Sequence, residues 1–217
     1  MICNLGVISS NLIGGSKKVK CMGVYIVALP RTGSTALTKS FGAQHGWKIY
    51  AEPWNPASEF YNTFSLKGVH KDSPIVVKTM IDAVPKSHIG PAYTFHIEMA
   101  KYFDKVILLD RFNTQLQSES LVYAKKSTDW HTKYSIKSQS PIEVEEQRYY
   151  IEKCKAQLEC LSVELNNNII YYEDLYSGNS STRDSILESW GLVNTKARLF
   201  FDPKYKYRQR NNSQVLL

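Results

Sequence analysis

Residues 24–37 read VYIVALPRTGSTAL, and this stretch decides the fold. The apolar run Val24–Leu29 is typical of a buried strand in a parallel sheet. A short turn, Pro30–Gly33, separates this run from a helix that begins at Ser34. A strand, a glycine-containing loop and a helix start present free backbone N–H groups and a positive dipole end to an anion. Arg31 adds a fixed positive charge, so the stretch predicts a phosphate- or sulfate-binding loop. Its hydroxyl donors are Thr32, Ser34 and Thr35.

The length and composition predict one globular domain. The chain has 217 residues, of which 43% are hydrophobic and 22% charged, and this is enough for one α/β domain with a large core. We expect an N-terminal extension over residues 1–21 and a single domain over residues 22–217, with a basic tail from about residue 195. The formal net charge of +7 suits an anionic cofactor or substrate, and it would suit nucleic acid equally well.

The four cysteines have neither paired nor metal-type spacing, which favours reduced thiols in a reducing compartment. No apolar run reaches the roughly 18 residues that a membrane span needs. The N-terminus lacks the charged region that opens a signal peptide. The sequence therefore predicts a soluble, cytoplasmic protein. It also predicts no metal site, because His, Cys and Asp side chains do not cluster along the chain.

Apolar strands alternate with helical patterns along the rest of the chain. Strands are predicted at residues 47–51, 75–80, 105–110 and 169–172. Helices are predicted over residues 34–44, 91–103 and 113–125, from residue 141, and over 181–190. Ser140, Pro141 and Glu143 predict a capping box at the start of the long fourth helix. The alternation predicts an α/β fold with three layers, α/β/α, around a mostly parallel central sheet.

The predicted anion loop differs from the loop that binds nucleoside triphosphates. That loop requires Gly-x4-Gly-Lys-Ser/Thr, in which the lysine reaches the β- and γ-phosphates. When the chain is aligned on Gly33, Ser34 stands at the lysine position and Ala28 at the first glycine position. A basic residue lies inside the turn instead, at Arg31. These differences argue against ATP or GTP hydrolysis and disfavour a divergent P-loop kinase.

The turn Pro30–Thr35 resembles the 5′-phosphosulfate loop of sulfotransferases that use 3′-phosphoadenosine-5′-phosphosulfate (PAPS). That loop reads Pro-Arg/Lys-Ser/Thr-Gly-Ser/Thr-Thr, and Pro30–Thr35 matches it at each position. The resemblance implies a P-loop NTPase-like sulfotransferase fold, PAPS as co-substrate and no metal. It assigns the 5′-phosphosulfate to Arg31, Thr32, Gly33, Ser34 and Thr35.

Two later segments resemble the same family. Sulfotransferases place an arginine after a later strand, and a serine about two helical turns on, to hold the 3′-phosphate. Arg111 matches the arginine, although a surface salt bridge would also explain it. The usual serine spacing falls on Glu119. The run 117–121 resembles soluble bacterial and viral (phage-type) relatives in which the loop is one residue longer, and this resemblance implies Ser120, with Ser118 as the alternative. The segment 170–175, IYYEDL, resembles a largely structural family segment whose carboxylates can cap a following turn.

The resemblance also implies a catalytic base. In carbohydrate-type relatives the base is a glutamate after the first helix, and Glu52 matches that position. Glu52 could instead order its own loop or pair with Lys78. Lys78 could stabilise charge on the sulfuryl oxygens, or it could be an edge-strand lysine whose charged end reaches solvent. Relatives acting on small phenols use a histidine base, but none of the five histidines sits in a matching motif. They are His45, His70, His88, His96 and His131.

The acceptor is less well defined by the sequence. Trp54 could stack on a sugar or fill the core, and Trp130–His131 could form a lid or be a structural pair. Arg208 and Arg210 could close over the 3′-phosphate or be a solvated charge run.

Two classes of function follow. The first is an enzyme that moves a sulfuryl group from PAPS to a hydroxyl or amine of a glycan, lipid or small molecule. The second is a non-catalytic protein on the same fold that binds a nucleotide or polyanion. Glu52 favours the enzyme, because a binding protein needs no base, and nucleic acid is not the expected partner. The sequence indicates no particular oligomeric state.

Overall fold

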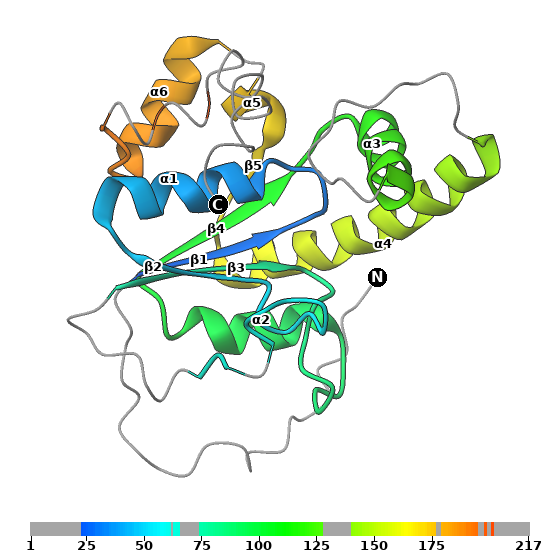
Figure 1. Ribbon diagram of the computed structural model, residues 1–217, viewed down its shortest axis with the longest axis horizontal. Helices are drawn as coiled ribbons and strands as arrows, with labels where there is room; N and C mark the ends of the chain where they lie inside the picture. The colour runs from blue at the N-terminus through cyan, green and yellow to red at the C-terminus, as the bar shows by residue number, and fades with distance from the viewer. Residues whose placement is uncertain are drawn as a thin grey trace.

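The computed structural model describes residues 23–61, 63–65, 74–127, 140–176, 179–194, 198 and 201. A central sheet of five strands runs through this part of the chain, and all its pairings are parallel. The strands lie in the order β2-β3-β1-β4-β5 (Figure 1). Their bounds are β1 Gly23–Ala28, β2 Lys48–Ala51, β3 Ile75–Met80, β4 Lys105–Asp110 and β5 Ile169–Tyr171.

Helices cover both faces of the sheet, so the predicted three-layer α/β/α fold is confirmed (Figure 1). Helices α1, α5 and α6 lie on one face, and α2 and α4 lie on the other. Helix α3 packs mainly against α4. The helix bounds are α1 Ser34–His45, α2 Ala92–Ala100, α3 Thr114–Ser127, α4 Pro141–Leu165, α5 Tyr172–Tyr176 and α6 Ser180–Ser189.

Strand β1 is buried along its whole length because it is central and covered on both faces. Successive side chains of a strand point to opposite faces. Tyr25 and Val27 accordingly pack under α2 and α4, while Val24 and Ile26 pack under α1 and α6. This arrangement explains why the run that begins at Val24 is continuously apolar instead of alternating.

The strand connections indicate at which edge of the sheet a ligand site is expected. All five strands are parallel, so their carboxyl ends lie on the same edge. Helix α1, which follows β1, packs on one face through Leu37 and Phe41, whereas α3, which follows β4, packs on the other through Leu121. Adjacent strands whose following helices diverge in this way open a crevice at their carboxyl ends, and open α/β sheets bind ligands there.

Most predicted elements are confirmed, with two corrections. The last strand ends at Tyr171, and Tyr172 begins α5 instead of continuing the strand. Ser140 is the N-cap of α4 and Pro141 its first residue, but the Ser140 side chain makes no capping hydrogen bond. Only the reciprocal half of the capping box forms, between the Ser140 backbone and Glu143. No helix among the described residues is long and apolar enough to cross a membrane.

His96 is a core residue, not a catalytic base. Its Nε2 lies 2.8 Å from the carbonyl oxygen of Ile81 and its Nδ1 lies 2.5 Å from the hydroxyl of Tyr25. A carbonyl can only accept, so Nε2 carries the proton and Nδ1 accepts from Tyr25. Burial, assisted by the charge of His88 and opposed by the bond to Ile81, lowers the pKa of His96 to about 4. The ring is therefore neutral in the folded protein at pH 7.

Acidification should weaken the fold through His96. The unfolded ring binds a proton near pH 6.5 and the folded ring only near pH 4, so the free energy of unfolding falls as pH drops through this window. The expected loss is about 3 kcal/mol, and urea denaturation between pH 7 and pH 4 measures it. The variant His96→Gln should lose this part of the pH dependence; equal slopes in both proteins would show that His96 is not responsible.

Candidate functional site

Two hydrogen bonds to backbone carbonyls at the edge of the sheet fix the conformation of the turn after β1. Leu29 donates its N–H to the carbonyl of Leu109 at 3.0 Å, and the Thr32 hydroxyl donates to the carbonyl of Leu29 at 2.8 Å. Arg31 has a φ of 66°, a left-handed conformation that is uncommon for a residue with a side chain. The proton of the Thr32 hydroxyl is therefore used inside the turn and is not directed toward an anion bound by the loop.

Gly33 joins the turn to α1, and only a residue without a side chain fits at this position. Its φ is 75°, and a Cβ atom at this position would lie 2.3 Å from Cε2 of Tyr176. Gly33 is the N-cap of α1, and no side chain caps this helix. The first N–H groups of α1 are the ones that bind anions at such helix starts. Ser34 is buried and Thr35 is exposed at this helix start.

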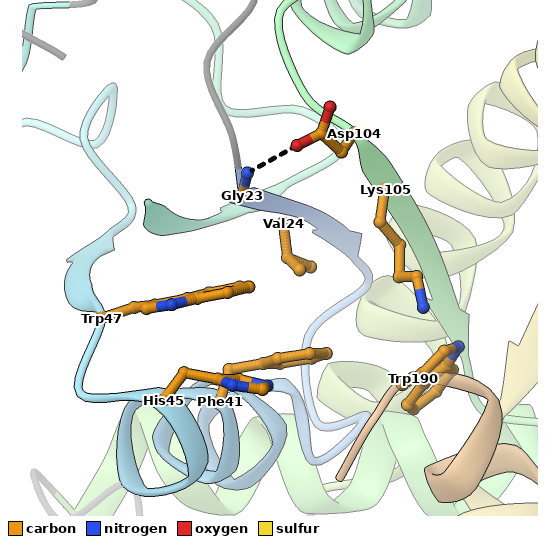
Figure 2. Close-up of a pocket in the computed structure, with 8 residues that line it drawn as sticks. All are labelled: Gly23, Val24, Phe41, His45, Trp47, Asp104, Lys105 and Trp190. Carbon is orange, nitrogen blue, oxygen red and sulfur yellow. Dashed lines mark hydrogen bonds between the residues drawn. The ribbon is translucent and has the colours of Figure 1, made fainter. Parts of the chain in front are cut away.

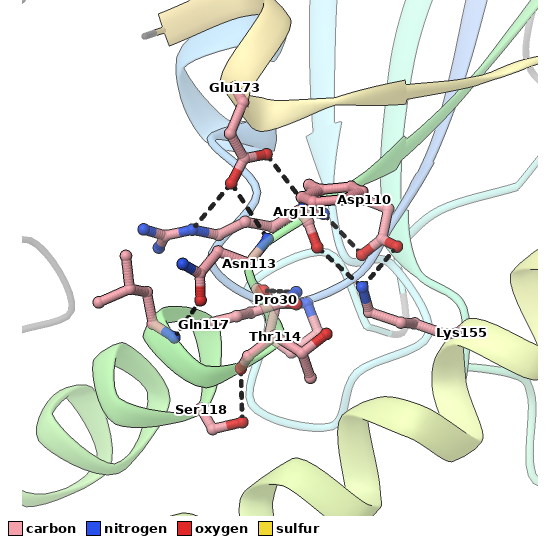
Figure 3. A network of polar contacts seen from close by, with 11 residues as sticks. Pro30, Asp110, Arg111, Asn113, Thr114, Gln117, Ser118, Lys155 and Glu173 are labelled. Carbon is pink, nitrogen blue, oxygen red and sulfur yellow. Dashed lines mark hydrogen bonds and ion pairs between the residues drawn. The ribbon is translucent and has the colours of Figure 1, made fainter.

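Helix α3 supports the turn through two side chains. The Nε of Arg31 donates to the hydroxyl of Ser120 at 2.8 Å. Gln117, which is 0% exposed, donates its side-chain amide to the carbonyl of Pro30 at 2.8 Å (Figure 3). Of the two candidate serines, Ser120 therefore lies at the loop. Ser118 instead donates its hydroxyl to the carbonyl of Thr114 inside α3, at 2.8 Å.

Arg111 follows β4 and forms the second cationic position. Its side chain is only 13% exposed, its Cζ lies 4.8 Å from the ring centre of Tyr172, and its Nε lies 3.7 Å from Glu173. Glu173 also accepts the backbone N–H groups of Phe112 and Asn113, at 2.9 and 3.3 Å (Figure 3). The sequence suggested that carboxylates of this segment cap the turn that follows them, whereas Glu173 binds the distant turn after β4. Among the described residues, the Arg111 Nε has no partner at hydrogen-bond distance.

Lys155 of α4 fixes the backbone beside Arg111. Its ammonium lies 3.0 Å from the Asp110 carboxylate and donates to the Arg111 carbonyl at 2.8 Å. Burial raises the pKa of Asp110, although the bonds from Lys155 and from the Arg111 backbone act to lower it. Figure 3 shows this frame on the α4 side of the turn, with the Arg111 guanidinium directed the other way. Lys155 thus fixes the main chain of Arg111, while the Arg111 side chain extends away from Lys155.

Glu52, the residue after β2, forms an ion pair with Lys78, the fourth residue of β3. Lys78 pairs in register with Ala51 on one side and Ile26 on the other, and its side chain is 4% exposed. The edge-strand interpretation of Lys78 is therefore wrong, because β3 lies between β2 and β1. Asn55 donates to the second Glu52 oxygen at 2.8 Å. The φ of 54° at Glu52 turns the chain sharply where the strand ends.

The electrostatics keep the Glu52 carboxyl ionised. Burial alone would raise its pKa, but the charge of Lys78 and the hydrogen bonds from Lys78 and Asn55 outweigh burial and lower the pKa below 4.5. At neutral pH, Glu52 is therefore a carboxylate with one oxygen bonded to an ammonium and the other to an amide. A carboxylate in this form can accept a proton.

The described candidates for acceptor binding and for a histidine base all pack against or bond to other parts of the fold. Trp54 is half-buried and packs edge-on against Tyr25, Phe64 and Phe95, with ring centres 4.9–6.3 Å apart, so it fills the core. His88 bonds to Pro91 and Thr94, and His45 stacks on Trp47. The remaining candidates lie outside the described residues: His70, Trp130, His131, Arg208 and Arg210.

A separate pocket of about 210 Å³ lies at the amino ends of β1 and β4, opposite the predicted site (Figure 2). Trp47 and Trp190 flank it, and Phe41 lies between them. Its two charged side chains already bind backbone atoms: Lys105 donates to the Ser189 carbonyl at 2.9 Å, and Asp104 accepts from the Gly23 N–H at 3.3 Å. Its polar groups thus serve the fold.

Three residues of the site were not foreseen from the sequence: Gln117, Lys155 and Tyr176. Each acts on a segment far away in the chain, so only the fold brings it to the site. The described residues contain no group of three or more His, Cys, Asp or Glu side chains that could hold a metal ion. No protein-family model matches this chain, and no curated protein matches it significantly.

Proposed function

We propose that this protein is a sulfotransferase that moves a sulfuryl group from PAPS to a hydroxyl or amine of a glycan, lipid or small molecule. One observation carries the proposal. The Arg31 turn, Arg111 and Glu52 directly follow β1, β4 and β2, and Lys78, which pairs with Glu52, lies in the carboxyl half of β3; the carboxyl ends of these four strands share one edge of the sheet. Two cationic positions suit the two phosphate groups of the nucleotide, and the carboxylate suits the proton of the acceptor.

Features of the two cationic positions support a nucleotide with two anionic groups. The N-terminus of α1 carries no side-chain cap, so its N–H groups suit a 5′-phosphosulfate. The buried Nε of Arg111 lacks a hydrogen-bond partner within the described residues, and leaving a buried donor unpaired is unfavourable. A 3′-phosphate would pair with the Arg111 guanidinium, and Ser120, whose hydroxyl accepts from Arg31 at 2.8 Å, would supply a hydroxyl to the same ligand.

In this proposal the residues divide the chemistry among three tasks. PAPS supplies the sulfuryl group and leaves as adenosine 3′,5′-bisphosphate. Glu52 accepts the proton of the acceptor hydroxyl as the new S–O bond forms and the bond from sulfur to the phosphate oxygen breaks. Arg31 and the backbone of residues 32–35 stabilise the charge that develops on the leaving phosphate. Lys78 stabilises the negative charge on the sulfuryl oxygens. To do so, its ammonium exchanges its contact with the Glu52 carboxylate for a contact with the sulfuryl group.

The alternative is a non-catalytic nucleotide- or polyanion-binding protein. The Glu52–Lys78 pair disfavours it, because removing two charges from water carries a desolvation penalty that binding an anion elsewhere does not require. A divergent P-loop kinase remains disfavoured by Ser34 at the lysine position. Nucleic acid is disfavoured as a partner, because the two cationic positions are separate and recessed.

The transfer assay tests this proposal directly. PAPS is incubated with the protein and a panel of sugars, phenols, lipid alcohols and amines, and acceptor-dependent release of adenosine 3′,5′-bisphosphate is measured. The proposal expects release with at least one acceptor class, and release should disappear in the Arg31→Ala variant. Nucleotide binding without release for any class would favour the binding protein.

Replacing Lys78 with methionine should move the acidic limb of the rate profile to higher pH. Lys78 and Asn55 hold the pKa of the wild-type carboxyl below its ordinary value, so its acidic limb should lie at lower pH than that of an ordinary carboxyl. Without the ammonium, burial dominates and the Glu52 pKa rises, so the limb should move up by about 1–3 pH units. The measurement is kcat/KM between pH 4 and pH 8. An unmoved limb would show that Glu52 is not the titrating base.

A further inference from the structure

Tyr176 contacts the anion loop from a segment 143 residues away in sequence. Its side chain is buried at the end of α5, and its hydroxyl donates to the carbonyl of Gly33 at 2.8 Å. The same carbonyl accepts the N–H groups of Ala36 and Leu37, at 3.0 and 3.2 Å. Three donors therefore fix the direction of one carbonyl at the start of α1.

The direction of this carbonyl determines where Ser34 points its N–H. The peptide group between Gly33 and Ser34 is planar and trans, so its C=O and N–H point in opposite directions. The carbonyl points into α1 and toward Tyr176, and the Ser34 N–H consequently points out of the helix start, toward the predicted anion. The Tyr176 ring also occupies the space that a Cβ of residue 33 would need.

The same ring reaches the second cationic position through a stack. Tyr176 stacks on Tyr172, with ring centres 4.7 Å apart and planes inclined at 23°, and Arg111 lies 4.8 Å above Tyr172. On its other side Tyr176 stacks on Phe201, with ring centres 5.3 Å apart. The Tyr172–Tyr176 stack thus stands between Gly33 and Arg111.

We infer that Tyr176 is a positioning residue of the site. It orients the Ser34 N–H through its hydroxyl and the Arg111 guanidinium through the Tyr172 ring, and so sets the spacing between the two anion positions. The stack therefore selects nucleotides that carry both a 5′ and a 3′ phosphate over those that carry one. This inference rests on the proposed function, because it concerns the same two positions.

Binding of three nucleotides tests the inference: adenosine 3′,5′-bisphosphate, adenosine 5′-monophosphate and adenosine 3′-monophosphate. Tyr176→Phe keeps the ring and removes the hydroxyl, so it should weaken both 5′-phosphorylated ligands about 3- to 10-fold and leave the 3′-monophosphate unchanged. Tyr172→Leu removes the ring below Arg111, so it should weaken the two 3′-phosphorylated ligands and spare the 5′-monophosphate. Tyr149→Phe, the same change at an exposed position of α4, should change nothing.

Each outcome separates this inference from the proposed function. If the wild-type protein binds none of the three nucleotides, the proposed function fails and the inference fails with it. If the wild-type protein binds them but Tyr176→Phe has the same affinities, or loses all three equally, only the inference fails. A purely structural role for the hydroxyl would lower the melting temperature without changing the preference among the ligands. If the Tyr176 variant does not fold, Tyr172→Leu tests the stack instead: unchanged affinities, or equal losses for all three nucleotides, would refute the inference.

Discussion

Sulfuryl transfer should slow by about 10²–10⁴-fold when Glu52 is replaced by glutamine, because the acceptor proton loses its base. Glutamine keeps one oxygen that can accept from Lys78, and its NH2 group, which is similar in size, replaces the oxygen that accepts from Asn55. The side chain keeps its size, although the bond from Asn55 is lost. The affinity for adenosine 3′,5′-bisphosphate should remain close to that of the wild type. Single-turnover kinetics with a working acceptor, combined with nucleotide titration, separate these two effects.

The matched control is Glu59→Gln, the same change at an exposed carboxylate of the segment that follows β2. It should leave both transfer and binding unchanged. Because Glu52→Gln leaves the buried Lys78 ammonium without a counter-ion, its melting temperature should be measured alongside. A folded Glu52→Gln protein with full transfer activity would refute the base assignment, while the nucleotide site would stand.

The second large effect is expected at Arg111. Its replacement by alanine should weaken binding of adenosine 3′,5′-bisphosphate about 10- to 100-fold, since a hydrogen bond to a charged group contributes roughly 1.5–3 kcal/mol. The loss should be specific to the 3′-phosphate, so the affinity for adenosine 5′-monophosphate should hardly change. Calorimetric titration of both nucleotides measures this difference.

Two further variants give the controls for Arg111. Arg111→Lys keeps the charge but not the fork of donors, so its affinity should lie between those of the wild type and the alanine variant. Arg148→Ala removes an exposed arginine of α4 that pairs with Glu145, and it should leave binding unchanged. Equal losses for both nucleotides in Arg111→Ala would indicate that Arg111 serves the fold through Glu173 and Tyr172 instead of a phosphate.

The architecture was predictable because burial leaves a direct mark on the sequence. The runs at Val24–Leu29, 75–80 and 105–110 are apolar without alternation, as strands covered on both faces must be, and each forms a strand of the sheet. The helix predicted from residue 113 begins at Thr114, and the Asn113 side chain accepts the N–H of Leu116 at 2.9 Å, as a helix cap does. Local chemistry of this kind requires no knowledge of distant segments.

The contacts that build the site were only partly predictable. The turn at Arg31 and the position of Arg111 follow from what comes directly after an apolar strand. The supports do not, because Gln117 and Tyr176 reach the turn across 87 and 143 residues of sequence. Lys78 was ambiguous because a lysine in an apolar run has the same pattern at an edge strand as in an interior one, and only the strand order decides between them.

The central claim is that the turn after β1 and the residues after β4 together bind one nucleotide with 3′ and 5′ phosphates. Calorimetric titration of adenosine 3′,5′-bisphosphate into the wild-type protein tests this claim most directly, with ATP titrated as the comparison. The account predicts one saturable site with a Kd below about 100 μM and binding of ATP at least about tenfold weaker. No binding of the bisphosphate at about 1 mM, or tighter binding of ATP, would contradict it.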